Sequence, residues 1–225
     1  MTISRFFLFI LMVVYAHAKE PTFVQRANSV AVFGGMGIQI VTAPDVVQYI
    51  NSIALYSQRI NDFGTSIDFF GGCEFPISDS WGIKLEHAYI FKSYSVPGKS
   101  GGTIDFFYAK HSPTMIIQHV ITGYGYFVKL GAGGSYHLGN AEQKVSTFGV
   151  VTTYSTDGIG LKAEAVGQTA FDEHLFGYIG GTFGWDFTGD LTEKNGRKLV
   201  LPNSTTPVSL SSLSAGLRFG IIYYL

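Results

Sequence analysis

The sequence contains a single cysteine, Cys73, in 225 residues. One cysteine excludes an intramolecular disulfide, and it also excludes a zinc site built from several cysteines. Charged residues are scarce as well, at 14% of the chain, and the formal net charge is −1. A chain this close to neutral has no basic face for nucleic acid, so we expect no nucleic-acid partner.

Long hydrophobic runs are also missing. A transmembrane helix needs about twenty apolar residues, and no stretch of even about eighteen occurs. A shorter apolar run, Phe6 to Tyr15, follows Arg5 and precedes Ala16-His17-Ala18. A positive start, a short apolar run and small residues at the cleavage positions are typical of a secretory signal peptide. We therefore expect residues 1–18 to be cleaved and residues 19–225, starting at Lys19, to form a single domain.

Catalytic motifs are absent too. The sequence has no metalloprotease, serine-hydrolase, phosphate-loop or dinucleotide-binding motif in its proper context. His111 and Ser112 precede Pro113, but no paired base or orienting acid is evident for this serine. Because proline removes a hydrogen-bond donor from a sheet, we expect a strand break or bulge here rather than a nucleophile. The prediction is a non-enzymatic protein without catalytic, cofactor-binding or metal-binding residues.

Glycine and aromatic residues are abundant, with 28 glycines and 15% aromatics. This composition suits strands and tight turns. The last residues, Leu213 to Leu225, have apolar side chains at every odd position, whereas the even positions are small or polar, with Arg218 among them, up to Gly220 and apolar at Ile222 and Tyr224. Since side chains alternate between the faces of a strand, this segment has one wholly apolar face and one partly polar face. In a membrane β-barrel the apolar face points to lipid and the polar face points inward.

Seven further segments alternate in a similar way. The expected strands are residues 29–41, 65–77, 81–96, 103–121, 126–138, 158–171, 175–187 and 213–225. Short turns at 78–80, 122–125 and 172–174 alternate with connections of roughly twenty residues. The remaining connection, Pro97 to Gly102, is brief, and its long flanking strands are expected to rise above the membrane as a hairpin. Together these features predict an all-β fold, an eight-stranded antiparallel up-and-down transmembrane barrel.

The first long connection contains a candidate helix. Pro44-Asp45 is typical of a helix start, and apolar residues then recur at helical spacing up to about Ile60. An amphipathic helix that covers the barrel mouth is the first interpretation, because an apolar helical stripe usually packs on its own protein. A surface for contact with a partner is the alternative.

The alternation also predicts which charged side chains point inward. The residues expected to form ion pairs in the interior are Asp68, Glu74, Lys84, Glu86, Lys92, Asp105, Lys129, Lys162, Glu164 and Arg218. An eight-stranded barrel is only wide enough for side chains to fill it, so these charges must pair or meet trapped water. We expect a plug of ion pairs, with a polar or gated pore as the alternative. By this alternation His87 and His119 fall on the lipid-facing side; either they are neutral imidazoles at packing sites, or a bulge shifts the parity locally.

Aromatic residues cluster near the ends of the expected strands, as membrane-interface belts require. The candidate belt residues are Phe75, Trp81, Tyr126, Phe171, Phe176, Trp185 and Tyr223. Phe106 and Tyr108 lie toward the long connections and are expected near the outer belt.

The architecture and the last strand resemble the outer-membrane β-barrel superfamily, in particular the small OmpA- and OmpX-like eight-stranded barrels. The resemblance covers residues 29–225 and implies location in a Gram-negative bacterial outer membrane. It further implies contact with lipid and lipopolysaccharide, insertion by the barrel-assembly machinery through the C-terminal strand, and no cofactor. The implied function is structural, adhesive or in envelope integrity through the outer loops. The alternatives are a narrow channel for ions or small solutes and a secreted, soluble lipocalin-like binder of small molecules.

Overall fold

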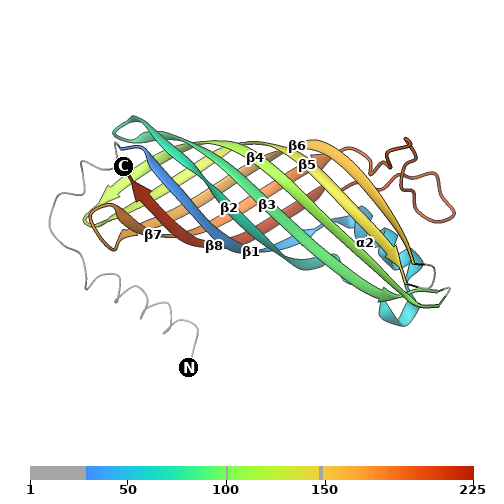
Figure 1. Cartoon of the computed structure of the whole chain (residues 1–225). Coiled ribbons are helices and arrows are strands. Elements are labelled where there is room, and N and C mark those ends of the chain that lie inside the picture. Colours follow the sequence, from blue (N-terminus) through green and yellow to red (C-terminus); the bar gives the residue numbers. More distant parts are fainter. Residues whose placement is uncertain (1–28, 100, 147–148) are drawn as a thin grey trace, which may run out of the picture.

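The computed structural model describes residues 29–99, 101–146 and 149–225, and in these residues eight strands pair in chain order into a closed barrel (Figure 1). The expected signal peptide, residues 1–18, lies outside the described residues. The strands are β1 (Ala31–Thr42), β2 (Phe63–Ser78), β3 (Trp81–Pro97), β4 (Thr103–Gly123), β5 (Tyr126–Val145), β6 (Val150–Ala170), β7 (Leu175–Thr188) and β8 (Ser212–Tyr224). Every neighbouring pair is antiparallel, so the predicted up-and-down barrel is confirmed.

The outer wall of the barrel is apolar. In β8, Leu217 points outward and is 56% exposed, whereas the next residue, Arg218, points inward and is 1% exposed. The same alternation runs through the other strands, because successive side chains of a strand point to opposite faces. The outward set includes Ile38, Phe69, Met115, Leu130, Leu161, Phe183 and Phe219, all exposed. A continuous apolar band of this kind is the lipid-facing surface of a membrane barrel.

The barrel closes between its first and last strands. Gly35 of β1 lies opposite Gly220 of β8. A Cβ atom on Gly35 would lie 2.1 Å from the carbonyl oxygen of Phe219, which is far inside van der Waals contact. Glycine is therefore required here so that the two backbones can approach.

The two ends of the barrel differ. The start of β1 and the C-terminus lie at one end, with the short turns β2–β3, β4–β5 and β6–β7, and helix α2 (Pro44–Ile53) lies at the other (Figure 1). The helix is shorter than predicted, because Ala54 is extended (ψ 156°) and forms a β-bridge with Gly98. A single 3-10 turn (Tyr56–Gln58) follows. No helix in the described part of the chain is long and apolar enough to cross a membrane.

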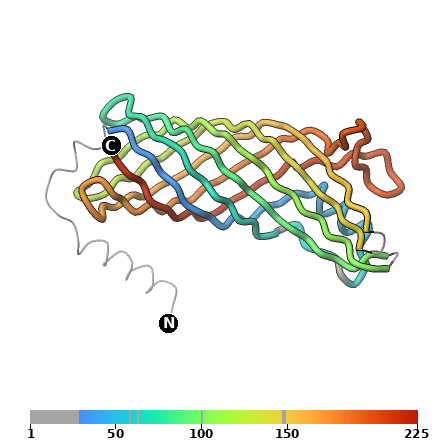
Figure 2. Tube along the Cα trace, in the orientation of Figure 1, coloured from blue at the N-terminus to red at the C-terminus, as the bar shows by residue number. Residues whose placement is uncertain are grey.

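The β3–β4 and β5–β6 hairpins extend beyond the other strands of the barrel. Strands β5 and β6 continue to Val145 and from Val150, so the expected connection of roughly twenty residues between them is wrong. Together with the β3–β4 hairpin, the β5–β6 hairpin extends the barrel at the end where α2 lies (Figure 2). Their outward residues there are polar, for example Asn140, Glu142 and Lys144. Strand segments above the membrane face water, so they lack the apolar alternation that revealed the rest of the barrel.

Strand β4 continues across Pro113, although its ladder to β5 lacks pairs at Ser112 and Pro113. Pairing with β3 is continuous from Trp81–His119 to Pro97–Thr103, and His87 faces Pro113 within this ladder. The expected break at Pro113 is therefore wrong. The register shift lies instead between Pro76 and Ser78, at the end of β2. A bulge is tolerated at the rim of a barrel, where few ladder bonds remain to be disrupted.

Candidate functional site

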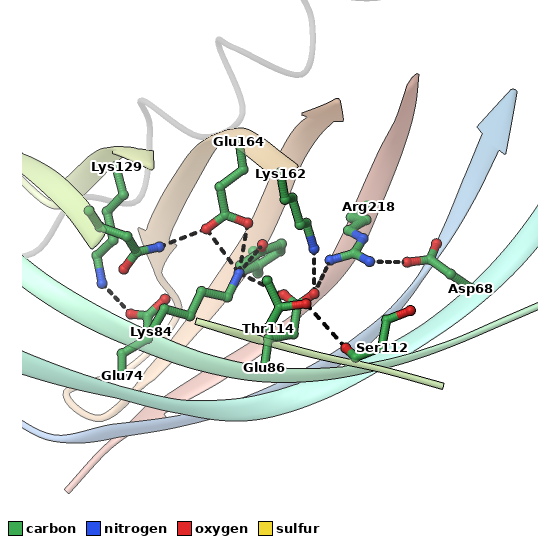
Figure 3. Close-up of polar contacts among 12 residues, drawn as sticks. Asp68, Glu74, Lys84, Glu86, Ser112, Thr114, Lys129, Lys162, Glu164 and Arg218 are labelled. Atoms are coloured by element: carbon green, nitrogen blue, oxygen red, sulfur yellow. Dashed lines mark hydrogen bonds and ion pairs between the residues drawn. The ribbon is translucent and has the colours of Figure 1, made fainter. Parts of the chain in front are cut away.

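The middle of the barrel interior contains a network of ion pairs centred on Lys84 (Figure 3). The Lys84 ammonium lies 2.9 Å from Glu164 and 3.0 Å from Glu86, and it donates to the Tyr178 hydroxyl at 3.0 Å. Neither Lys84 nor the two carboxylates have any exposed side-chain surface. A buried charge is tolerated only when it is paired and hydrogen-bonded, and all three are.

Arg218 joins this network from β8. Its guanidinium lies 2.7 Å from Glu86 and also pairs with Asp68, while Lys162 pairs with Glu86 from β6. The guanidinium carbon lies 4.6 Å from the centre of the Phe70 ring, a cation–π contact. The cluster therefore joins β2, β3, β6 and β8 through the interior of the barrel, as Figure 3 shows.

A smaller group lies nearer the C-terminal end of the barrel. Lys129 pairs with Glu74 and donates to the Tyr224 hydroxyl at 3.0 Å, and that hydroxyl donates to Gln168 at 2.5 Å. Below it an apolar cluster closes the interior, in which Phe127 and Phe176 are 0% exposed. Eight of the ten charged residues expected in the interior are thus brought together in pairs.

Two of the ten are placed differently. Lys92 is buried, but among the described residues its ammonium has no hydrogen-bond partner and lies 4.7 Å from the centre of the Tyr94 ring. Asp105 lies on the outward side of β4, above the apolar band, so its assignment to the interior is wrong. The error follows from the expected break at Pro113, because a continuous strand places only the even-numbered residues of β4 inside.

A second polar cluster, which the sequence reasoning missed, lies toward the outer end. Lys110 donates to Asp186 at 2.5 Å and to Ser212 at 2.8 Å. Asp186 also lies 3.0 Å from Nε2 of His137, whose Nδ1 lies 2.8 Å from the Ser112 hydroxyl. The alternation carried a signal for Lys110 and Asp186, since both share parity with the inward residues of their strands.

The expectation that Ser112 has no paired base and acid is therefore wrong in geometric terms. The order of serine, imidazole and carboxylate is that of a hydrolase triad, but the ring nitrogens are exchanged, because Ser112 faces Nδ1 and Asp186 faces Nε2 of His137. Ser112 is only 3% exposed, however, and the adjacent cavity is about 30 Å³. This volume holds a water molecule rather than an acyl substrate. In the described residues no group of three or more side chains could hold a metal ion.

The outer mouth of the barrel is covered by an apolar cap. We use this term for α2, the 189–211 connection and the inner face of the projecting hairpins. Its buried residues are Ala43, Val46, Tyr49, Ile50, Ala54, Val96, Ile104, Phe106, Tyr108, Ala141, Tyr154, Leu191, Leu199, Val208 and Leu210. Phe106 and Tyr108 thus belong to this cap and not to a lipid-facing belt. The predicted amphipathic helix covers the mouth as expected.

Two polar contacts connect the helix to the rest of the cap. Asp45 accepts a hydrogen bond from the Ser209 hydroxyl at 2.7 Å, and the Tyr49 hydroxyl donates to Gln143 of β5 at 2.9 Å. Burial raises the pKa of Tyr49 to about 12, because a phenolate would lose hydration there. Near neutral pH the phenol therefore keeps its proton and its hydrogen bond.

Most of the expected belt aromatics point outward. Six are exposed on the wall: Phe75, Trp81, Tyr126, Phe171, Trp185 and Tyr223. Phe176 is not among them, because it points inward and packs against Tyr224, with ring centres 5.0 Å apart. Its assignment to a belt is wrong, since it occupies an even position in β7 whereas the outward residues of that strand are odd.

Comparison with known proteins finds similarity in structure alone. No protein-family model and no curated protein matches the sequence. A major outer membrane protein from Thermus thermophilus superposes with a TM-score of 0.54 at 12% identity, covering 88% of this chain and 100% of that one. Neisserial surface protein A gives 0.52 at 11% identity, with 87% and 97% covered.

OprG from Pseudomonas aeruginosa is also similar, with a TM-score of 0.50 at 13% identity and 89% and 97% of the two chains covered. Identities this low establish the fold and no more, and the fold agrees with the closed ladder and the apolar outer wall. The expectation of an outer-membrane barrel is confirmed at this level. The chain has the fold of the small eight-stranded outer-membrane β-barrels.

Proposed function

We propose that this protein is a closed, non-conducting outer-membrane barrel that anchors a structured platform on the outer surface of the membrane. Its role is then structural, adhesive or in envelope integrity, and it is exerted through that platform. The observation that carries the proposal is the filled interior, in which ion pairs and two apolar clusters follow one another from end to end.

The interior argues against the channel alternative. An eight-stranded barrel is just wide enough to be filled by side chains, and here both charged clusters lie across its width. The cavity between Lys162, Arg218 and His137 measures about 30 Å³, close to the space of one water. Above it, the cap removes the opening that a pore would need at the outer end.

The outer wall argues against the soluble alternative. A lipocalin-like protein keeps polar residues outside and a ligand cavity inside. This barrel does the reverse, with residues such as Ile159 at 64% and Leu161 at 60% exposure outside and lysine–glutamate pairs inside. The same wall supports the proposed contact with lipid and lipopolysaccharide. The apolar face of β8 supports recognition of the last strand by the barrel-assembly machinery.

The surface of the platform contains a recess that suits binding. A recess of about 390 Å³ lies between α2, the β5–β6 hairpin and the 189–211 connection. Tyr49, Gln143, Tyr154 and Arg197 line it, so it combines aromatic and hydrogen-bonding groups. The hydrogen bond from Tyr49 to Gln143 and the ion pair between Lys198 and Asp190 support its walls.

Electrical recording tests the proposal directly. The barrel is refolded into planar lipid bilayers, its folded state is checked by the difference in gel mobility before and after boiling, and current is recorded in potassium chloride. We expect no steady conductance steps. A steady conductance proportional to salt concentration would establish the narrow-channel alternative instead.

The role of the platform needs a separate measurement. Replacing residues 193–198 with a short glycine–serine linker shortens the 189–211 connection while leaving every barrel strand intact. We expect this variant to fold as wild type and to lose surface adhesion, or resistance to detergent, in cells that express it. Unchanged adhesion and unchanged detergent resistance would contradict a role for the platform.

A further inference from the structure

Two histidines face the lipid side by side. His87 of β3 and His111 of β4 both point outward, and Nε2 of His87 lies 3.2 Å from Nδ1 of His111. Ionisable residues in membrane-spanning segments are rare and usually point into the protein, so a pair on the lipid face calls for a function. The outward parity expected for His87 is correct, and no bulge displaces it, because the β3–β4 register is continuous.

The pair lies next to a group of aromatic rings on β3 and β4. The His111 ring is 4.9 Å from the Tyr89 ring, and Phe91 in turn contacts both Tyr89 and Phe107, with centres 5.8 and 6.5 Å apart. Aromatic belts mark the level of the lipid headgroups, where water and phosphate oxygens are present. On the other side of His87, the facing residue of β2 is Gly71, which has no side chain.

The separation of the two nitrogens matches a metal chelate. Zinc–imidazole bonds are about 2.0–2.1 Å long, so two nitrogens on one ion lie ~2.9–3.4 Å apart for angles between 90° and the tetrahedral value. The observed 3.2 Å falls within this interval. In the metal-free pair the gap holds one N–H. A shift of that proton to the outer nitrogen of its own ring leaves two lone pairs facing each other, with no net loss of a proton.

We propose that His87 and His111 form a two-nitrogen site for a divalent transition-metal ion such as Zn²⁺ or Cu²⁺. Imidazole suits both ions. No third metal-binding side chain joins them within the described residues, so water or the phosphate oxygens of outer-leaflet lipids complete the coordination. The site is independent of the proposed platform function and of the interior network.

The test uses Cu²⁺ as the probe and the intact folded barrel in detergent micelles. Copper is titrated calorimetrically, and the bound ion is examined by electron paramagnetic resonance for coupling to two equivalent nitrogens. We expect one ion per barrel. His87→Ala and His111→Ala should each weaken binding by ~10²-fold or more, because a two-point attachment becomes a single one.

His119→Ala is the matched control. His119 is a third histidine of the wall, but it packs against Trp81 with ring centres 5.0 Å apart and has no second imidazole beside it among the described residues. It should bind copper as wild type does. Gel mobility before and after boiling verifies that all variants are folded. No binding by the wild type, or equal binding by all four proteins, would overturn the proposal and leave a simple hydrogen bond between neutral imidazoles.

Discussion

Arg218→Met tests whether the interior network holds the barrel together. Methionine replaces the aliphatic part of the arginine side chain and can lie against Phe70, but it has no charge. Glu86 retains Lys84 and Lys162 after the substitution. Asp68 loses its ion-pair partner, because Arg218 is the one cation paired with it among the described residues. The variant therefore leaves a carboxylate buried and uncompensated.

The expected loss is large compared with the total stability. Removing one partner of a buried ion pair costs ~3–5 kcal/mol, whereas folded domains are stable by about 5–15 kcal/mol. At ~1.4 kcal/mol for each factor of ten, the folding equilibrium should fall by ~10²- to 10⁴-fold. Arg218 is 1% exposed, so solvent does not screen this effect.

Urea unfolding in lipid vesicles, followed through the fluorescence of Trp81 and Trp185, measures the loss. A second variant separates charge from packing, because Arg218→Met combined with Asp68→Asn removes the stranded carboxylate. We expect this double variant to recover most of the stability. An ordinary surface substitution changes the free energy of unfolding by no more than ~0.5 kcal/mol, so a loss below this value for Arg218→Met would refute the reasoning. A double variant that is no more stable than Arg218→Met would also refute it.

The same network predicts a leak. Water that enters to hydrate an unpaired charge relieves part of its cost, so Arg218→Ala and Glu164→Ala should conduct ions in planar bilayers where the wild type does not. Glu164 is the acidic counterpart of Arg218 in this test, because its carboxylate lies 2.9 Å from the Lys84 ammonium and also accepts a hydrogen bond from Gln118 at 2.8 Å. If neither variant conducts ions, packing alone keeps the interior closed.

Three further predictions concern the wall, the closure and the cap. Leu217→Arg or Phe219→Arg should reduce folding into liposomes, because an arginine near the bilayer midplane costs ~2–4 kcal/mol, and folding of both variants to the wild-type yield would contradict the lipid-facing assignment. Gly35→Ala should slow or prevent barrel closure, as its Cβ would lie 2.7 Å from the Cα of Gly220, and an unaltered rate of folding on gels would count against this. Burial raises the pKa of Tyr49 to about 12, whereas the tyrosine pKa in the unfolded chain is near 10. The protonated phenol therefore stabilises the cap fully below about pH 10, and this stabilisation, up to about 2–3 kcal/mol, is lost as the pH rises through 12. Tyr49→Phe should remove this dependence in limited proteolysis between pH 9 and 12, and a persisting dependence would assign it to another group.

Sequence reasoning succeeded where one physical rule applied throughout a segment. In β8 the membrane imposes apolar side chains on one face, so Leu217, Arg218 and Phe219 received their correct orientations. The same rule placed Lys84 and Glu164 inside, although alternation gives only the face of each side chain. Which cation meets which anion depends on the register between strands, and this could not be read from single segments.

The failures have equally physical causes. Above the membrane the rule no longer applies, so the polar outer faces of β5 and β6 looked like loops. Pro113 does not break β4, because one missing donor does not end a strand whose other ladder bonds persist. The expected break reversed the parity of Asp105 and concealed Lys110. The approach of Ser112 to His137 and Asp186 joins three strands and is visible only in three dimensions.

The position of Arg218 on the final strand has a consequence for the order of assembly. Asp68 lies on β2 and Glu86 on β3, so both acids are present before β8 has been added to the barrel. Until β8 pairs with β1 and β7, no guanidinium is available to Asp68. The strand that closes the ladder is thus also the strand that supplies the partner of Asp68. Closure of the ladder and compensation of the Asp68 carboxylate therefore finish in one step.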